Sequence, residues 1–198
     1  MHRRRFLLLA PAALLAACGR PDSAPKFNFT DISSVDWARG FDLTDQTGKR
    51  RTIADFRGKA VMLFFGYTHC PDACPTTLAE MAEVVKRLGP DGARVQGVFI
   101  TVDPERDTAD VLAQYVPAFH PSFIALRGTP EEIARTAKEF KVYYQANRSE
   151  AGGSGQYLVD HTSAIFIFDP QGKPRLYVSQ NGRTTARIVE DLKRLLGT

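Results

Sequence analysis

Two cysteines stand close together in the stretch Gly66-Tyr-Thr-His-Cys-Pro-Asp-Ala-Cys-Pro75. Cys70 and Cys74 are separated by three residues, where an apolar run gives way to a helical pattern. Thiols at that spacing can lie one helical turn apart and point the same way, so they can form a disulfide or bind one metal ion. A helix N-terminus beside them favours the thiolate that both reactions need. Two unrelated cysteines, one of them buried and inert, are the alternative, which the scarcity of cysteine disfavours because the chain has only three.

The surrounding sequence alternates apolar runs with helical spacings. We expect strands over 60–65, 95–102, 122–126 and 142–146, hairpins over 41–53 and 164–179, and helices over 75–88, 108–116, 130–140 and 184–196. This order predicts an α/β sandwich in which helices flank a central mixed sheet, with an N-terminal β-hairpin. Ligand sites in such sheets lie beyond the carboxyl ends of strands, and the junction after Phe65 is such an end.

The composition is globular: of 198 residues, 43% are hydrophobic and 24% charged, which suits one domain with a core. The formal charge of +4 by itself suggests a nucleic-acid partner. Residues 1–17 hold three of the 26 basic residues and no acidic residue, so the rest carries 23 basic against 22 acidic residues. No basic face for nucleic acid is therefore expected.

The N-terminus combines three arginines with an apolar run that ends in Leu15-Ala-Ala-Cys18, a pattern typical of an export signal. It resembles a bacterial lipobox, and the arginines also resemble a twin-arginine signal. We expect residues 1–17 to be a lipoprotein-type signal peptide, Cys18 to be lipidated, residues 18–26 to form a tether and residues 27–198 to fold. The predicted location is the bacterial periplasm, anchored to the membrane by the lipid on Cys18. The alternative is a buried Cys18 in an uncleaved segment.

Four blocks resemble the signature blocks of the Sco/SenC family: Gly66–Pro75, Thr101–Thr108, Phe119–Leu126 and Val159–Ser163. The resemblance is ordered and covers about 41–196. It implies a thioredoxin-like fold and a membrane-tethered copper protein that helps to assemble the binuclear copper centre of cytochrome c oxidase. It also implies that Cys70, Cys74 and His161 bind copper, because His161 stands near the place of a proline that faces the cysteine pair in thioredoxin-like reductases.

The chemistry of these residues agrees with copper as the cofactor. Cu(I) favours thiolates, and imidazole suits Cu(I) and Cu(II), so the set can hold either oxidation state. A structural zinc site usually needs a fourth protein ligand, for which His69, His120 or an aspartate would have to serve. A loop histidine without a ligand role is the preferred interpretation of His69, and a structural role is preferred for His120.

Three carboxylates lie near these residues in the sequence. Asp160 could orient the imidazole of His161 from behind, or be a solvated carboxylate at a strand end. Asp72 could tune a thiol pKa or meet a partner, or simply be a helix-start carboxylate favoured by the dipole. Asp103 could border the site, although a turn explains it nearly as well.

The first functional hypothesis is a non-catalytic metallochaperone that passes copper to the copper-bearing subunit of cytochrome c oxidase. Other copper carriers or thiol reductants would be further partners. The alternative is a thiol-disulfide oxidoreductase or redox sensor that acts on the acceptor's cysteines through a Cys70–Cys74 disulfide. A peroxidase is a third hypothesis, but the sequence shows no peroxide-binding cysteine motif.

Overall fold

The computed structural model describes residues 26–148 and 157–198. The strands are β1 (Thr30–Asp31), β2 (Asp42–Asp45), β3 (Arg50–Thr52), β4 (Ala60–Gly66), β5 (Val95–Thr101), β6 (Ile124–Arg127), β7 (Tyr144–Ala146), β8 (Val159–His161), β9 (Ile165–Phe168) and β10 (Pro174–Val178). The helices are α1 (Ala73–Arg87), α2 (Ala109–Tyr115), α3 (Pro130–Glu139) and α4 (Thr185–Leu196), with short 3-10 turns η1 (Ile53–Phe56), η2 (Gly89–Arg94) and η3 (Val116–Ala118).

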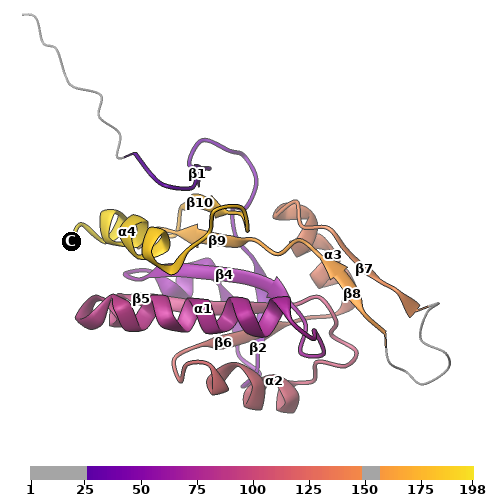
Figure 1. Ribbon diagram of the computed structural model, residues 1–198. Coiled ribbons are helices and arrows are strands. Elements are labelled where there is room, and N and C mark those ends of the chain that lie inside the picture. Colours follow the sequence, from indigo (N-terminus) through magenta and orange to yellow (C-terminus); the bar gives the residue numbers. More distant parts are fainter. Residues whose placement is uncertain (1–25, 149–156) are drawn as a thin grey trace, which may run out of the picture.

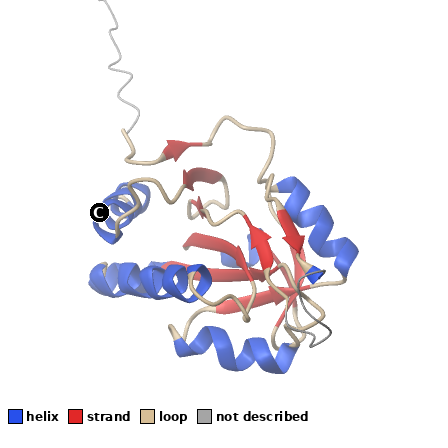
Figure 2. Ribbon diagram, turned by 45° about the vertical axis from the view of Figure 1, so that its right-hand side comes forward, coloured by secondary structure: helices blue, strands red, loops and turns tan. Residues whose placement is uncertain are grey.

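Eight strands form one mixed sheet in the order β1-β10-β9-β4-β5-β6-β2-β3. β5 is parallel to both β4 and β6, whereas the other pairs are antiparallel. β7 and β8 form a separate two-stranded ribbon that extends away from the end of the molecule where α4 lies (Figure 1). Helices surround the sheet (Figure 2), which confirms the predicted α/β, thioredoxin-like sandwich.

The central strands are buried on both faces. Every residue of β4 and of β5 is buried, as their uninterrupted apolar sequences predict. Because successive side chains point to opposite faces, Phe64 packs against Phe99 on one face and Phe65 against Phe140 on the other. This packing fixes the carboxyl ends of β4 and β5 next to each other.

Helix α1 begins directly beyond the end of β4. Pro75 stands in its first turn, where the missing N–H costs no hydrogen bond. Its apolar side chains Leu78, Met81 and Val84 are buried against the sheet. The helix N-terminus is therefore held at the carboxyl edge of the sheet, where the sequence predicts a site.

The predicted elements match the observed ones to within a few residues, but two strands are additional. β1 is two residues long, and β8 is three residues long with a polar residue at its centre, so neither carries a clear periodicity. The predicted signal peptide (1–17), the lipidated Cys18 and nearly all of the tether (18–26) lie outside the described residues and stay predictions. Within the described residues, no helix combines the length and apolarity that crossing a membrane requires.

Candidate metal centre

Both cysteines of the motif lie where the loop after β4 enters α1. Cys74 is in the first turn of α1 and fully buried, whereas Cys70 in the preceding loop is half-buried. The backbone N–H of Cys74 donates to Cys70 Sγ at 3.4 Å. Cys70 Sγ therefore lies against the N-terminus of α1, where a backbone N–H points at it.

His161 ends β8 and faces the cysteine pair. Its Nδ1 lies 3.2 Å from the carbonyl oxygen of Thr162, and because a carbonyl only accepts, Nδ1 carries the proton. Nε2 therefore presents a lone pair, and it lies 3.2 Å from Cys74 Sγ. Without a metal, the Cys74 thiol donates its proton to this nitrogen.

The three ligand atoms of Cys70, Cys74 and His161 all lie within 4.8 Å of one another. Among the described residues, this is the one group of three or more cysteine, histidine or carboxylate ligands that could hold a metal ion. Two sulfurs and one imidazole nitrogen are donors that suit copper in both of its common oxidation states. From the described part of the chain, no fourth ligand of the kind that a structural zinc site needs joins the group.

Gly66 lets the buried sulfur approach the end of β4. A Cβ atom at this position would lie 2.8 Å from Cys74 Sγ and 2.8 Å from the Phe99 ring. Real Cβ contacts are longer, so any larger residue would displace the sulfur or the ring. The glycine at the end of the apolar strand is thus part of the site.

Burial favours the neutral forms of Cys74 and His161 by shifting their pKa values. It raises the pKa of the Cys74 thiol far above its ordinary value. Burial also lowers the pKa of His161, although the hydrogen bond to Thr162 acts in the opposite direction. The rings of Phe64 and Tyr67 pack near the imidazole, each 5.9 Å away between centroids. A metal ion must therefore displace a proton from Cys74 but not from His161.

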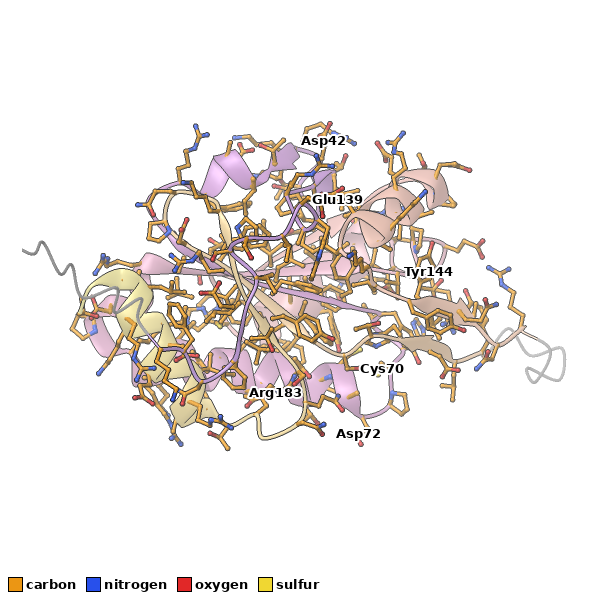
Figure 3. The ribbon with its side chains drawn as sticks, turned by 90° about the horizontal axis from the view of Figure 1, so that it is seen from above. Asp42, Cys70, Asp72, Glu139, Tyr144 and Arg183 are labelled. Carbon is orange, nitrogen blue, oxygen red and sulfur yellow. The ribbon has the colours of Figure 1, made fainter. Side chains whose placement is uncertain are left out.

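The structure gives Asp160 and Asp72 other partners. Asp160 is exposed and accepts from the side chain of Asn147 at 3.0 Å, because neighbouring residues of a strand point to opposite faces. The orienting role predicted for Asp160 therefore falls to the Thr162 carbonyl. Asp72 lies at the outer edge of the molecule, with Cys70 farther in (Figure 3), and accepts from the Thr76 hydroxyl at 3.2 Å. This placement favours a helix-start carboxylate.

The remaining histidines that the sequence offered as extra ligands are held elsewhere. His69 is exposed, and its Nδ1 lies 3.0 Å from the Thr68 hydroxyl. His120 Nδ1 lies 2.8 Å from the Ser122 hydroxyl. Neither histidine belongs to the group of three, which agrees with a loop histidine without a ligand role at position 69 and a structural histidine at position 120.

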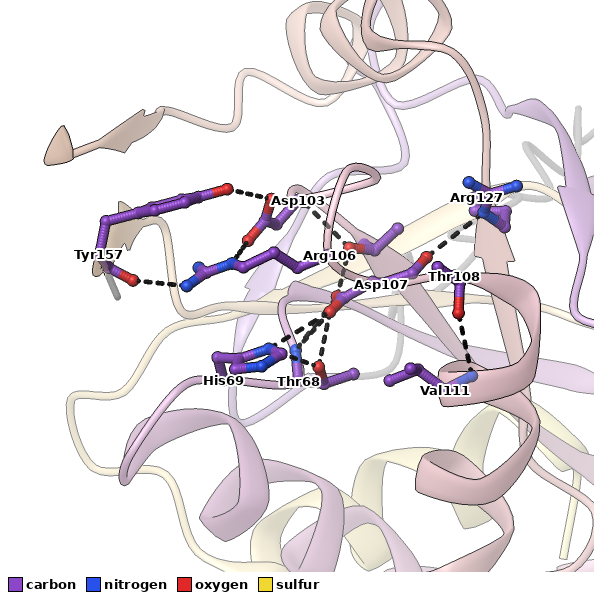
Figure 4. A network of polar contacts seen from close by, with 10 residues as sticks. Thr68, His69, Asp103, Arg106, Asp107, Thr108, Val111, Arg127 and Tyr157 are labelled. Carbon is purple, nitrogen blue, oxygen red and sulfur yellow. Dashed lines mark hydrogen bonds and ion pairs between the residues drawn. The ribbon is translucent and has the colours of Figure 1, made fainter. Parts of the chain in front are cut away.

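A buried carboxylate that sequence reasoning missed supports the cysteine loop (Figure 4). Asp107 is fully buried and accepts from the Thr68 hydroxyl and the Thr101 hydroxyl, each at 2.6 Å. It also accepts from the Thr68 backbone N–H at 3.1 Å. Burial raises the pKa of Asp107 in spite of these bonds. The carboxylate ties the residue two positions before Cys70 to the end of β5.

Arg106 and the rings of Tyr67 and Tyr157 form a second missed cluster beside the site; Figure 4 shows Arg106 with Tyr157 and Asp103. Its guanidinium pairs with Asp103 at 2.5 Å and lies 3.5 Å from the centre of the Tyr157 ring. The Tyr157 hydroxyl donates to Asp103 at 2.8 Å, and Arg106 also lies 5.7 Å from the centre of the Tyr67 ring. Asp103 thus borders the site through Arg106 and Tyr67. The block Thr101–Thr108 was the available signal, but single-sequence spacing does not show this stacking.

Residues 30–197 match the protein family described as SCO1/SenC. The chain belongs to the SCO1/SenC family. The predicted resemblance is therefore confirmed. The "Protein SCO2 homolog, mitochondrial" of Mus musculus is 42% identical over 156 residues, which cover 78% of this chain and 60% of the mouse protein. This SCO1/SenC chain thus spans less than two thirds of the length of that relative.

Solved SCO1/SenC structures include copper-bound proteins. ScoI of Bradyrhizobium japonicum with copper bound is 42% identical, with a TM-score of 0.69 over 79% of this chain and 98% of the other. Arabidopsis thaliana ScoI with copper bound is 34% identical, with a TM-score of 0.73 over 80% of this chain and 96% of the other. Together with the Cys-Cys-His donor set, these structures confirm the prediction of copper.

The predicted bacterial periplasmic location is wrong by the same comparison. SCO1/SenC relatives from mouse, human, yeast and Arabidopsis are all named as mitochondrial proteins. The physical reason for the error lies in the N-terminal pattern: mitochondrial transit segments are also rich in arginine and poor in acidic residues. Residues 1–17 satisfy both conditions, so their composition alone does not separate the two destinations.

Proposed function

We propose that this protein is a copper metallochaperone. It binds one copper ion through Cys70, Cys74 and His161 and passes it to the copper-bearing subunit of cytochrome c oxidase. One observation carries the proposal: Cys74 Sγ and His161 Nε2 lie 3.2 Å apart, although the two residues are 87 positions apart in the sequence. Membership of the SCO1/SenC family and the copper bound in related structures support it.

The proposed ligand set suits transfer as well as binding. Three protein ligands leave a coordination position open, and through it a ligand of the acceptor can enter before a ligand of the donor leaves. Cys70 is half-buried, whereas Cys74 is fully buried. Cys70 therefore offers the accessible sulfur, and Cys74 with His161 holds the ion from behind.

Proton movement follows from the tautomer and the burial of the two inner ligands. His161 is neutral and keeps its proton on Nδ1, so Nε2 is ready to bind. Cys74 must lose its thiol proton when copper binds, and it regains one when copper leaves. This exchange keeps the buried sulfur uncharged in the empty protein and disfavours an unpaired thiolate in an apolar environment.

A thiol-disulfide oxidoreductase is the second candidate, favoured by one observation. Cys70 Sγ accepts the backbone N–H of Cys74 at 3.4 Å and is the more exposed of the two sulfurs, so its thiolate is the one that can reach a disulfide of the acceptor. Attack of that thiolate on a disulfide of the acceptor, followed by Cys74, would reduce the acceptor and leave a Cys70–Cys74 disulfide. Such a reaction has no need of His161.

The test is copper stoichiometry and absorption of the fully reduced protein, with His161→Ala, Cys70→Ser and Cys74→Ser as variants. We expect about one copper per chain and a sulfur-to-copper charge-transfer band for Cu(II). Each cysteine variant should lose or alter the band, and His161→Ala should alter it and weaken Cu(II) binding. His120→Ala is the matched control, because that histidine lies outside the group of three.

Two results would contradict the proposal. If the unmodified protein retains no copper but rapidly reduces a disulfide substrate, the oxidoreductase is the correct function. If His161→Ala binds Cu(II) as the unmodified protein does, the ligand set is wrong even if copper binds.

A further inference from the structure

An arginine with a largely covered side chain contacts the helix that carries Cys74. Arg183 lies in the turn before α4, and its side chain is only 9% exposed. Its Nε pairs with the Glu80 carboxylate at 2.7 Å, and its Nη2 donates to Thr77 Oγ1 at 3.1 Å. Glu80 and Thr77 both lie on α1, within two turns of Cys74, and Figure 3 shows Arg183 beside that helix.

The same guanidinium reaches the segment that carries His161. Arg183 Nη1 lies 3.4 Å from the Ser163 carbonyl oxygen, to which it donates. The Ser163 hydroxyl donates in turn to the His161 carbonyl at 3.5 Å. One rigid group from a third part of the chain thus contacts the segments that carry both inner ligands.

The chemistry of a largely covered arginine explains what such a contact provides. Removing a guanidinium from water costs free energy of desolvation. The ion pair roughly offsets this cost, so it adds little net stability to the fold. Its planar fork of donors, however, fixes partners in defined directions. Because the partners of Arg183 belong to two different ligand-bearing segments, what this group fixes is their relative placement.

We propose that Arg183 is a positioning residue that sets the separation of Cys74 Sγ and His161 Nε2. The inference rests on the proposed function, in which both atoms bind copper. Two thiolates satisfy Cu(I), whereas Cu(II) depends more on the imidazole. Loosening the contact of Arg183 should therefore weaken Cu(II) binding much more than Cu(I) binding.

The experiment measures Cu(II) and Cu(I) affinities of the full chain by competition titration, together with the Cu(II) spectrum. The main variant is Arg183→Met with Glu80→Gln, which removes the donors while leaving no buried charge unpaired. We expect Cu(II) affinity to fall by about 10–100-fold, as for the loss of other groups that orient a metal ligand. The charge-transfer band should shift, and Cu(I) affinity should change far less.

Two further variants keep the test decisive. Arg183→Lys keeps the charge but not the fork, so it should show an intermediate loss of Cu(II) affinity even if the main variant fails to fold. Arg51→Met with Asp45→Asn removes another 2.7 Å ion pair, between β3 and the end of β2. This control should lower stability and leave both copper affinities unchanged.

The outcomes separate the inference from the function on which it rests. If the Arg183 variants unfold more easily but keep the spectrum and the ratio of Cu(II) to Cu(I) affinity, Arg183 has only a structural role and the inference is wrong. If His161→Ala already leaves Cu(II) binding unchanged, the proposed ligand set fails first. If both are correct, substituting Arg183 in the His161→Ala background has no further effect on Cu(II) affinity.

Discussion

Asp45 and Asp107 are buried carboxylates that each hold a loop in place, but their pKa values shift in opposite directions. Asp45 stands at the turn between β2 and β3 and is 2% exposed, whereas Asp107 lies beyond β5 and is fully buried. Burial acts against both charges. Hydrogen bonds led by Thr47 and Arg51 overcome it at Asp45 and lower the pKa to about 2. At Asp107 burial prevails and raises the pKa.

The difference lies in the charge of the partners. Arg51 pairs with Asp45 at 2.7 Å, so a full positive charge compensates the carboxylate. Asp107 accepts from two hydroxyls and one backbone N–H, and His69 Nδ1 is 3.9 Å away. Asp45 at the β2–β3 turn therefore contributes to stability in its charged form, whereas burial disfavours the charged form of Asp107 beside Cys70. Uncompensated burial of this kind is typical of functional sites.

Gly66→Ala should have the largest effect, at the junction between β4 and α1 where the cysteines lie. The added methyl group meets Cys74 Sγ and the Phe99 ring at 2.8 Å each, which should cost about 1–3 kcal/mol and displace the sulfur. Urea unfolding and copper titration measure the two effects. Gly97→Ala is the control, because its methyl group would meet the Phe123 ring at 2.4 Å, away from the cysteines. It should lower stability without changing copper affinity; equal copper losses in both variants would refute the assignment of Gly66 to the site.

Asp45→Asn should remove about 2 kcal/mol of stability at neutral pH, since its pKa is about 2 when folded against an ordinary value of 3.8. A lowered pKa stabilises the fold above the unfolded value, and this contribution is lost as the pH falls from about 4 toward 2. Urea unfolding between pH 7 and pH 2 measures it. The variant should lose less stability in this acid range than the unmodified protein, with copper affinity unchanged. If the free energy of unfolding falls equally with pH in the variant and in the unmodified protein, Arg51 does not compensate the charge of Asp45.

Copper affinity should rise with pH through the physiological range. Burial keeps the proton on Cys74, and copper must displace it, so affinity should increase about tenfold per pH unit for this proton. His161, whose pKa is lowered, is already neutral there and adds no slope. Competition titrations from pH 6.5 to pH 8 measure the dependence, and Cys74→Ser should reduce the slope by about one proton. An affinity independent of pH would mean that Cys74 is already ionised.

Asp107→Asn should have the smallest effect on stability. The pKa of Asp107 is raised in the folded protein. Its contribution to the free energy of unfolding is therefore fully present at low pH and is lost as the pH rises through that pKa. Asparagine avoids the buried charge but weakens the bonds from the threonines, so we expect a net change of about 1 kcal/mol or less at pH 7. Urea unfolding beside Asp45→Asn checks this. If Asp107→Asn and Asp45→Asn lose equal stability, the two carboxylates do not differ as their pKa shifts predict.

Much of the framework was predictable because it depends on local patterns. Continuous apolar runs predicted β4 and β5, and helical spacing predicted α1, since burial on two faces and burial of one stripe leave different periods in a sequence. The spacing of Cys70 and Cys74 predicted a pair of thiols at a strand-helix junction. The short β8 carried no such period, so His161 was linked to the cysteines only through resemblance to a family.

By itself, then, the sequence determined the α/β framework, the cysteine pair and the carboxyl edge where the pair lies. Tertiary structure decided which groups surround the pair: Thr162 rather than Asp160 behind the imidazole, and Arg183 between α1 and the segment after β8. The physical reason is that periodicity and spacing act over a few residues. The partners of Arg183, 20 and 106 positions away from it, meet it only where chain crossings and packing bring them together, and no local pattern encodes that distance. Behind the imidazole, Asp160 points outward to Asn147, so the carbonyl of the adjacent Thr162 accepts from Nδ1.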